Sequence, residues 1–185
     1  AYETLEDFSR SVEYGEQVLA MRKTLYGDRP HPDIAAALTK LGTAYQSWEV
    51  AKKDSGYFSK GLHYFELALT MYQDLYADQP NHNLAGALYN VSNTYNHLGN
   101  PHRGVVYGKQ ALIMRESIFG NKPHVDVACS LESMGEAHCT LRNHAKALEY
   151  RQRALVMYEQ LYDSSDPNPV LARANYNLGH TYHSL

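Results

Sequence analysis

Hydrophobic residues along this chain of 185 residues recur at steps of three and four, the spacing that gathers side chains on one face of an α-helix. The clearest example runs through Tyr150, Ala154, Met157 and Leu161. Three other segments carry counterparts at the same relative positions: Tyr14, Val18, Met21, Leu25; Tyr64, Ala68, Met71, Leu75; and Tyr107, Ala111, Met114, Ile118. Because one amphipathic helix cannot cover its own apolar face, we expect neighbouring helices to bury each of these faces.

A second kind of helix alternates with the first. Its centre holds a small residue with an aromatic residue or histidine three positions later: Gly42 and Tyr45, Ser92 and Tyr95, Gly135 and His138, Gly179 and Tyr182. Each copy follows a joint with a proline that halts the preceding helix, and each begins with a residue that can cap the new helix: His31, Asn81, His124 or Asn168. We call this type the A helix and the first type the B helix.

The repeat has a measurable length and one irregularity. Met71, Met114 and Met157 are 43 residues apart, whereas the interval from Tyr26 to Tyr76 is 50 residues. The surplus lies near residues 48–57, which hold the sole tryptophan. Seven residues are about two helical turns, so the flanking helices can lengthen and keep their phase. Two interpretations stay open: Trp48, Lys52 and Tyr57 form an extra contact surface, or Trp48 packs inside the longer hairpin.

Small residues also coincide between the two helix types. Gly42, Ser92 and Gly135 on the A helices match Gly61, Gly104 and Ala147 near the starts of the B helices, and Gly179 and Ser11 hold the same places at the two ends. Glycine inside a helix costs up to about 1 kcal/mol relative to alanine. Its recurrence at one register therefore predicts that the helices approach closely there.

Composition narrows the function. A net charge of -3 gives no basic surface for nucleic acid, and no apolar run is long enough to span a bilayer, so we expect neither partner. Cys129 and Cys139 lie ten residues apart in one predicted helix and cannot pair, which favours a reducing, cytoplasmic location. His180 and His183, and His138 beside Cys139, lack a third ligand at fixed spacing, so we expect no metal site. The chain also has no phosphate-binding loop and no nucleophile motif, so we expect no cofactor and no enzyme activity.

The pattern Leu41-Gly42-x-x-Tyr45, with small residues and alanines seven apart on the B helices, resembles the tetratricopeptide repeat (TPR). The run from Ala20 to Asp28, followed by His31-Pro32-Asp33, resembles the long TPR, of about 42 residues, of kinesin light chain and nephrocystin-type proteins. The resemblance implies an all-α fold: a right-handed α-solenoid of stacked antiparallel helix pairs, with eight helices. It also implies a scaffold for protein–protein interaction, which binds an extended peptide or a partner helix in a concave groove lined by the A helices.

The predicted boundaries follow from the register. We expect a single domain over 1–185 that is a fragment of a longer array, with a B helix at 2–27, repeats at 31–77, 81–120 and 124–163, and a final A helix at 168–185. Both ends then consist of an unpaired helix. An alternative function is therefore a structural segment that associates with itself end to end within a larger assembly.

The register also predicts which side chains face the groove. These are the residues two positions before and after the central leucine or its equivalent, some of the residues just before it, and one basic residue a turn earlier. The set is Thr39, Lys40, Thr43, Tyr89, Asn90, Asn93, Glu132, Glu136, Arg173, Tyr176, Asn177 and His180. Amides suit a peptide backbone and rings suit its side chains. Because Glu132 and Glu136 lie between Lys40 and Arg173, we do not expect a clamp for a terminal carboxylate.

Overall fold

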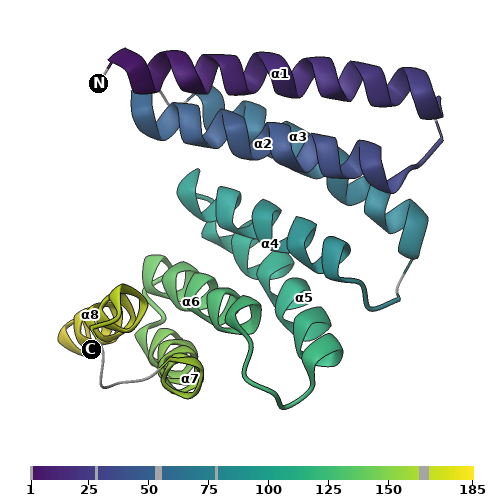
Figure 1. Ribbon diagram of the computed structural model, residues 1–185. Coiled ribbons are helices and arrows are strands. Elements are labelled where there is room, and N and C mark those ends of the chain that lie inside the picture. Colours follow the sequence, from purple (N-terminus) through teal and green to yellow (C-terminus); the bar gives the residue numbers. More distant parts are fainter. Residues whose placement is uncertain (1, 28, 53–55, 78, 163–166) are drawn as a thin grey trace. The chain divides into compact units, whose positions relative to one another are not determined.

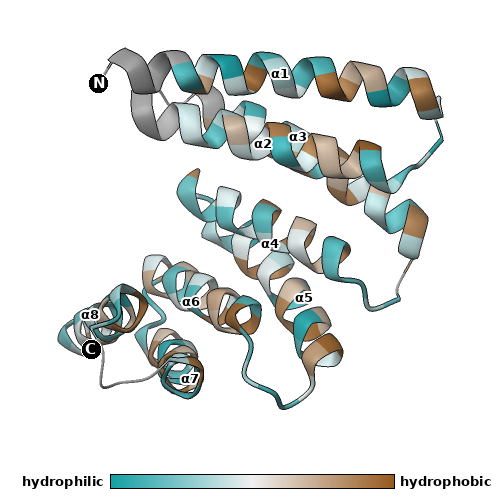
Figure 2. Cartoon of the chain, in the orientation of Figure 1, coloured by the Kyte–Doolittle hydropathy of each residue, from teal (hydrophilic) through white to brown (hydrophobic). Residues whose placement is uncertain are grey.

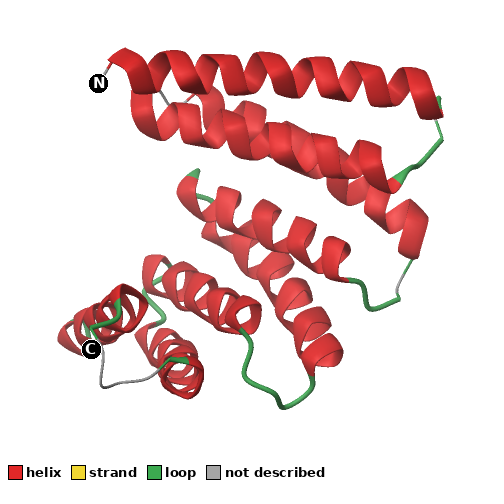
Figure 3. Cartoon of the chain, viewed as in Figure 1, coloured by secondary structure: helices red, strands yellow, loops and turns green. Residues whose placement is uncertain are grey.

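The computed structural model describes residues 2–27, 29–52, 56–77, 79–162 and 167–185. Within these ranges the chain forms eight α-helices and no strand (Figure 1, Figure 3). The helices are α1 (Tyr2–Tyr26), α2 (Pro32–Lys52), α3 (Gly56–Tyr76), α4 (His82–His97), α5 (Pro101–Phe119), α6 (Val125–Thr140), α7 (His144–Leu161) and α8 (Pro169–His183). The odd-numbered helices are the predicted B helices and the even-numbered ones are the A helices.

The helices divide into two compact units. The N-terminal unit, Ala1–Gln79, contains α1 to α3, and the C-terminal unit, Pro80–Leu185, contains α4 to α8. Within each unit every helix packs on its neighbour in the chain, and the A helices α4 and α6 also contact each other. Apolar residues alternate with polar ones along the helices (Figure 2), as expected for helices with one buried face. The A helices α4 and α6 therefore lie next to each other within the C-terminal unit.

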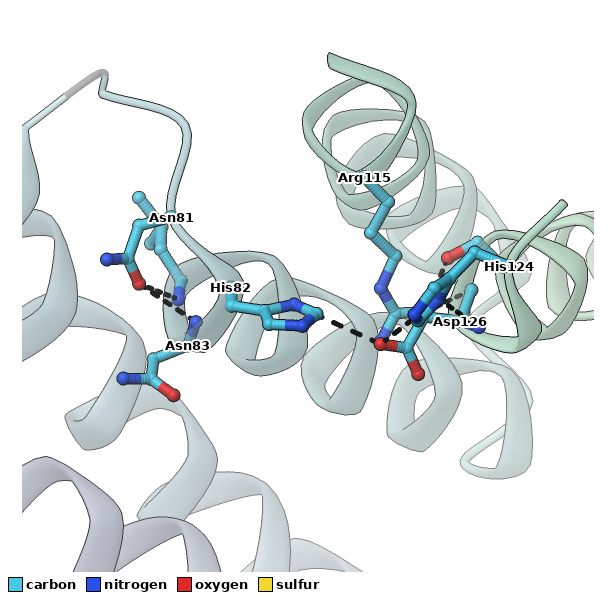
Figure 4. A network of polar contacts seen from close by, with 8 residues as sticks. Asn81, His82, Asn83, Arg115, His124 and Asp126 are labelled. Carbon is cyan, nitrogen blue, oxygen red and sulfur yellow. Dashed lines mark hydrogen bonds and ion pairs between the residues drawn. The ribbon is translucent and has the colours of Figure 1, made fainter. Parts of the chain in front are cut away.

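Histidine begins α6 as predicted. His124 Nδ1 accepts a hydrogen bond from the backbone amide of Asp126 at 3.1 Å, and its ring stacks on Phe119 with centroids 3.5 Å apart. The ring of His82, at the start of α4, points towards the Asp126 carboxylate and lies 4.0 Å from it (Figure 4). The start of α2 repeats the histidine cap and the stacking with His31, Asp33 and Tyr26.

Asparagine is the N-cap residue of the other two A helices, α4 and α8. Asn81 Oδ1 accepts hydrogen bonds from the amides of Asn83 and Leu84 at 2.8 and 3.3 Å (Figure 4), and Asn168 does the same at the start of α8. These bonds satisfy amides that have no partner within the first turn of a helix. The capping predicted for all four A helices is thus confirmed.

The small residues allow the close helix contacts that were predicted. A Cβ added to Gly42 would lie 2.8 Å from the buried ring of Phe65 and 3.1 Å from the carbonyl oxygen of Gly61. In the next hairpin Ser92 Oγ donates to the carbonyl oxygen of Gly104 at 2.7 Å. Gly179 is different, because a Cβ there would meet nothing within 4 Å. Close approach at the small residue is therefore confirmed between paired A and B helices and does not occur at Gly179.

Ring stacking joins the two helices of each complete hairpin. The aromatic residue or histidine of the A helix lies nearly parallel to the first tyrosine of the B-helix face, with centroids 5.4 to 5.8 Å apart. The pairs are Tyr45 with Tyr64, Tyr95 with Tyr107, and His138 with Tyr150. Their counterparts at the ends, Tyr14 on α1 and Tyr182 on α8, are exposed.

The expectation that neighbours bury every B-helix face is wrong for α1. Tyr14 is 64% exposed and Leu25 is 75% exposed, and Val18 and Met21 between them are exposed as well. On α7 the counterparts Ala154 and Met157 are buried and half-buried. The difference lies in the packing: α7 is covered by α6, the A helix before it, whereas among the described helices it is α2 that packs on α1.

The insertion lengthens both helices of the first hairpin. Helices α2 and α3 each have 21 residues, whereas the later A helices have 15 or 16 and the later B helices 18 or 19. The Trp48 ring is half-buried and lies 6.4 Å from the Tyr45 ring, which favours packing within the hairpin. The side chains of Lys52 and Tyr57 lie outside the described residues, so the proposed contact surface stays a prediction.

Candidate peptide-binding groove

The A helices of the C-terminal unit enclose a pocket of about 320 Å³. Its walls come from α4, α6 and α8, and one residue, Arg151, reaches it from the B helix α7. The lining residues are Tyr89, Asn93, Cys129, Glu132, Ser133, Glu136, Arg151, Arg173 and Asn177. Six of the twelve residues predicted from the sequence to face the groove belong to this set.

The other six predicted residues lie in two different places. Thr39, Lys40 and Thr43 line a second, smaller pocket of about 270 Å³ in the N-terminal unit, together with Phe8 and Ser11 of α1. Asn90, Tyr176 and His180 line neither pocket: Asn90 is half-buried on α4, and Tyr176 and His180 are exposed on α8. The groove assignment as a whole therefore stays a prediction. Of the two pockets, the one in the C-terminal unit is lined by more of the predicted residues.

Glu132 is the most heavily bonded residue of the pocket. Arg173 Nη2 donates to Glu132 Oε2 at 3.1 Å, the Tyr158 hydroxyl donates to the same oxygen at 3.0 Å, and Asn177 Nδ2 lies 3.4 Å from Oε1. The Glu132 carboxylate raises the pKa of Arg173, and burial raises the pKa of Tyr158. The negative charge of Glu132 and the positive charge of Arg173 therefore neutralise each other inside the pocket.

A buried cation supports the aromatic wall. The guanidinium carbon of Arg115 lies 4.5 Å from the centroid of the Tyr89 ring, within the range of a cation–π interaction. Arg115 also donates to the backbone carbonyl of Asp126 at 2.6 Å and to Ser130 Oγ at 2.7 Å. Burial raises the pKa of Tyr89 to about 12, so its hydroxyl stays neutral at physiological pH. Tyr89 is thus held as a fixed, uncharged ring.

Arg151 fills the space above a glycine. A Cβ on Gly135 would lie 2.7 Å from Arg151 Cγ, so only glycine at this position on α6 lets the arginine pass. Arg151 Nη1 donates to the backbone carbonyl of Asn177 and to Thr181 Oγ1, both on α8. Arg151 and Cys129 were not predicted. The one signal for Arg151 is that a charged residue stands where the other complete hairpins have Phe65 and Gly108.

Two polar side chains of the pocket remain open to a ligand. Among the described residues, no hydrogen bond or ion pair reaches the carboxylate of Glu136 or the side-chain amide of Asn93. They hold the same repeat position on the adjacent helices α6 and α4, and Glu136 is exposed while Asn93 is half-buried. The Asn93 amide can both donate and accept a hydrogen bond, and the Glu136 carboxylate accepts. Together they suit a ligand side chain that donates hydrogen bonds.

Comparison with known proteins identifies the architecture. Residues 1–33 and 84–126 match the sequence model of the tetratricopeptide repeat. The chain resembles the crystal structure of a Podosopora anserina protein assigned as a kinesin light chain with nearly identical TPR-like repeats, with a TM-score of 0.76 and 16% identity over 99% of this chain and 81% of that chain. It also resembles BtubC (BKLC) from P. vanneervenii, with a TM-score of 0.73 and 19% identity over 99% and 83% of the two chains. Comparison with curated protein sequences gives no match.

The fold is therefore an all-α solenoid of helix pairs. More narrowly, two stretches of the chain match the TPR sequence model, and its fold resembles the repeats of a kinesin light chain structure. This is an architecture of protein–protein interaction scaffolds.

Other kinds of site find no support within the described part of the chain. No group of three or more His, Cys, Asp or Glu residues there is arranged to hold a metal ion. Cys129 and Cys139 are both free thiols, as their spacing predicted. None of the described helices is long and apolar enough to cross a membrane.

Proposed function

We propose that this chain is a scaffold that binds an extended peptide or a partner helix in the groove lined by its A helices. The pocket of the C-terminal unit serves as the anchor of that groove. The observation that carries the proposal is the convergence of Tyr89, Asn93, Glu136 and Asn177 from three A helices on one pocket. The free thiols suit a reducing compartment such as the cytoplasm. No catalytic step is part of the proposal.

The pocket has the chemistry that a peptide requires. The uncharged ring of Tyr89 offers an apolar surface, and the Asn93 amide can pair with the N–H and C=O groups of an extended backbone. A pocket of about 320 Å³ is large enough for one peptide side chain rather than a folded domain. The neighbouring helix surfaces then contact the rest of the segment.

The experiment is a selection from a phage-displayed random peptide library on the purified chain, followed by affinity measurements with selected synthetic peptides. Asn93→Ala is the main test variant, because its amide makes no bond within the described structure and its loss leaves the fold intact. Lys109→Ala, exposed on the B helix α5, is the matched control. We expect Asn93→Ala to weaken peptide binding several-fold and Lys109→Ala to leave it unchanged. Equal binding by both variants would show that the groove is not the site.

A second candidate function, end-to-end self-association, is favoured by a different observation. The positions that stack in the complete hairpins are exposed on the outer helices: Tyr14 on α1 is 64% exposed and Tyr182 on α8 is 52% exposed. If α8 of one molecule packs against α1 of a second copy, Tyr182 and Tyr14 form the same stacked pair as Tyr95 and Tyr107. Such a head-to-tail contact is heterologous and leaves both outer faces of a dimer free for further copies.

Sedimentation of two variants tests this contact. Tyr14→Lys and Tyr182→Lys each destroy one side of the interface, so each variant alone should be monomeric at concentrations where the wild-type chain associates. A mixture of the two retains one intact side on each molecule and should form dimers and nothing larger. A wild-type chain that stays monomeric at high concentration, or a mixture without dimers, would refute the head-to-tail contact.

A further inference from the structure

The pocket of the C-terminal unit contains two carboxylates and two guanidinium groups, so its formal charge is balanced. The four groups differ, however, in what they already bind. Selectivity for a charged ligand depends on the groups that are still unpaired, because a paired group must first give up its partner. The bonding of each group therefore decides which peptides the pocket prefers.

Both cations are engaged. Arg173 forms an ion pair with Glu132, and the Tyr158 hydroxyl and the Asn177 amide also face that carboxylate. Arg151 is nine-tenths buried and donates to a backbone carbonyl and a hydroxyl of α8. An acidic peptide side chain would have to compete with Glu132 for Arg173 and would also approach Glu136. The pocket therefore disfavours a carboxylate.

Glu136 is the exception. It is exposed, it lines the pocket, and within the described residues its carboxylate has neither a hydrogen-bond donor nor a cation. Asn93, at the same position on α4, adds a carbonyl oxygen that accepts a hydrogen bond. An ammonium or guanidinium group at the mouth of the pocket would meet one full negative charge and one neutral acceptor, without breaking any existing bond.

From this arrangement we propose that the pocket selects a peptide with a lysine or arginine side chain, which pairs with Glu136 beside Asn93. The inference rests on the proposed peptide-binding function and specifies its ligand. The ion pair lies at an exposed rim, where such pairs contribute modestly, so the preference for a basic over a neutral residue is about two- to fivefold in affinity.

The test starts from peptides selected on the wild-type chain, with each basic residue replaced by glutamine or glutamate. We expect lysine or arginine to be enriched in the selected pool. We expect replacement by glutamine to weaken binding about two- to fivefold and replacement by glutamate to weaken it further. In the variant Glu136→Gln the difference between the lysine and glutamine peptides should vanish. Glu159→Gln, an exposed carboxylate on α7 outside the pocket, is the matched control and should keep the full difference.

The variant Arg173→Gln should change the preference for the lysine peptide in the opposite direction to Glu136→Gln. Removal of Arg173 leaves Glu132 without a cation, so the preference for the lysine peptide over the glutamine peptide should increase. The inference is overturned if acidic residues are enriched and Arg151→Gln abolishes their binding, because Arg151 would then be the anchor. It is also overturned if peptides bind Asn93→Ala more weakly but bind Glu136→Gln with the same lysine preference as the wild type. In that case the peptide binds in the groove, and Glu136 does not select its charge. Peptides that bind Asn93→Ala as well as the wild type would instead refute the groove itself.

Discussion

Gly42 and Gly179 hold the same place in the repeat, and replacing each by alanine should change stability in opposite directions. On α2, a Cβ at Gly42 would lie 2.8 Å from Cε1 and 2.9 Å from Cδ1 of Phe65, whose side chain is only 1% exposed. It would also lie 3.1 Å from the carbonyl oxygen of Gly61. On α8, a Cβ at Gly179 would meet nothing within 4 Å. The two sites therefore differ in packing and share their helical conformation.

The expected magnitudes follow from two terms. Alanine is favoured over glycine inside a helix by up to about 1 kcal/mol, and this term applies at both positions. Forcing an extra carbon into a packed core costs about 1 to 3 kcal/mol, and this term applies only at Gly42, where a buried ring and a backbone atom leave no room. Gly179→Ala should therefore stabilise the chain by about 0.5–1 kcal/mol, and Gly42→Ala should destabilise it by about 1–2 kcal/mol.

The assay is urea unfolding followed by far-ultraviolet circular dichroism, with the free energy of unfolding extrapolated to water. A second substitution checks the cause: Phe65→Leu shortens the side chain that the new methyl group strikes, so it should cost less in the Gly42→Ala background than in the wild type. If Gly42→Ala proves as stabilising as Gly179→Ala, the close contact between α2 and α3 does not exist. If Gly179→Ala is destabilising only at high protein concentration, a second molecule packs on that face of α8.

Two further predictions concern a buried histidine and a helix cap. Burial lowers the pKa of His138, so at this residue the folded chain binds fewer protons than the unfolded chain. The free energy of unfolding should therefore fall as the pH drops below about 6.5, by at most about 1.4 kcal/mol per pH unit. His138→Tyr, which installs the tyrosine of the other A helices against Tyr150, should flatten this dependence in urea unfolding measured across a pH series, whereas an unchanged slope would assign it to other groups. Asn81→Ala removes the acceptor for the first amides of α4 and should lower the free energy of unfolding by about 0.5–2 kcal/mol. Asn81→Asp should restore most of this loss, and failure of both variants to differ from the wild type would show that the cap contributes nothing.

The positions of the helices were predictable because they depend on local signals that recur. A proline joint, a capping residue and a face with steps of three and four mark each helix, and the predicted final A helix at 168–185 is observed as Pro169–His183. Part of the lining of the pocket was predictable from the same register. Once the central leucine of an A helix or its equivalent is known to face the core, the residues two positions on either side of it must lie on the opposite side of the helix. Glu132 and Glu136 were placed on this basis.

The interactions within the pocket were not predictable, because they depend on contacts between helices far apart in the sequence. Arg151 bonds to α8 some 26 and 30 residues later, and no local pattern gives the direction of a long side chain. The same holds for Arg173, which lies 41 residues from its partner Glu132. From the sequence these charges appear as separate residues of mixed sign. Their bonding emerges only when the helices are packed, and it leaves Glu136 as the charged side chain of the pocket without a hydrogen bond or ion pair among the described residues.

The packed structure also shows two kinds of joint that alternate along the chain. Before α2 and α6 the B helix supplies an arginine, Arg22 or Arg115, which donates to the backbone carbonyl of the aspartate in the first turn, and the last aromatic residue stacks on the histidine cap. Before α4 and α8 the same position holds Tyr72 or Tyr158, the cap is asparagine, and the last aromatic residue stacks instead on that tyrosine.

This alternation bears on where a ligand site can form. At an arginine joint the guanidinium donates to a backbone carbonyl of the following A helix. In the joint before α6, Arg115 also lies against the Tyr89 ring. At the tyrosine joint before α8, the Tyr158 hydroxyl reaches Glu132, on the groove side of α6. The pocket of the C-terminal unit lies between one joint of each kind, so the cation behind its aromatic wall and the hydroxyl that donates to Glu132 come from different joints. A repeat with a single kind of joint would supply one of these features and lack the other.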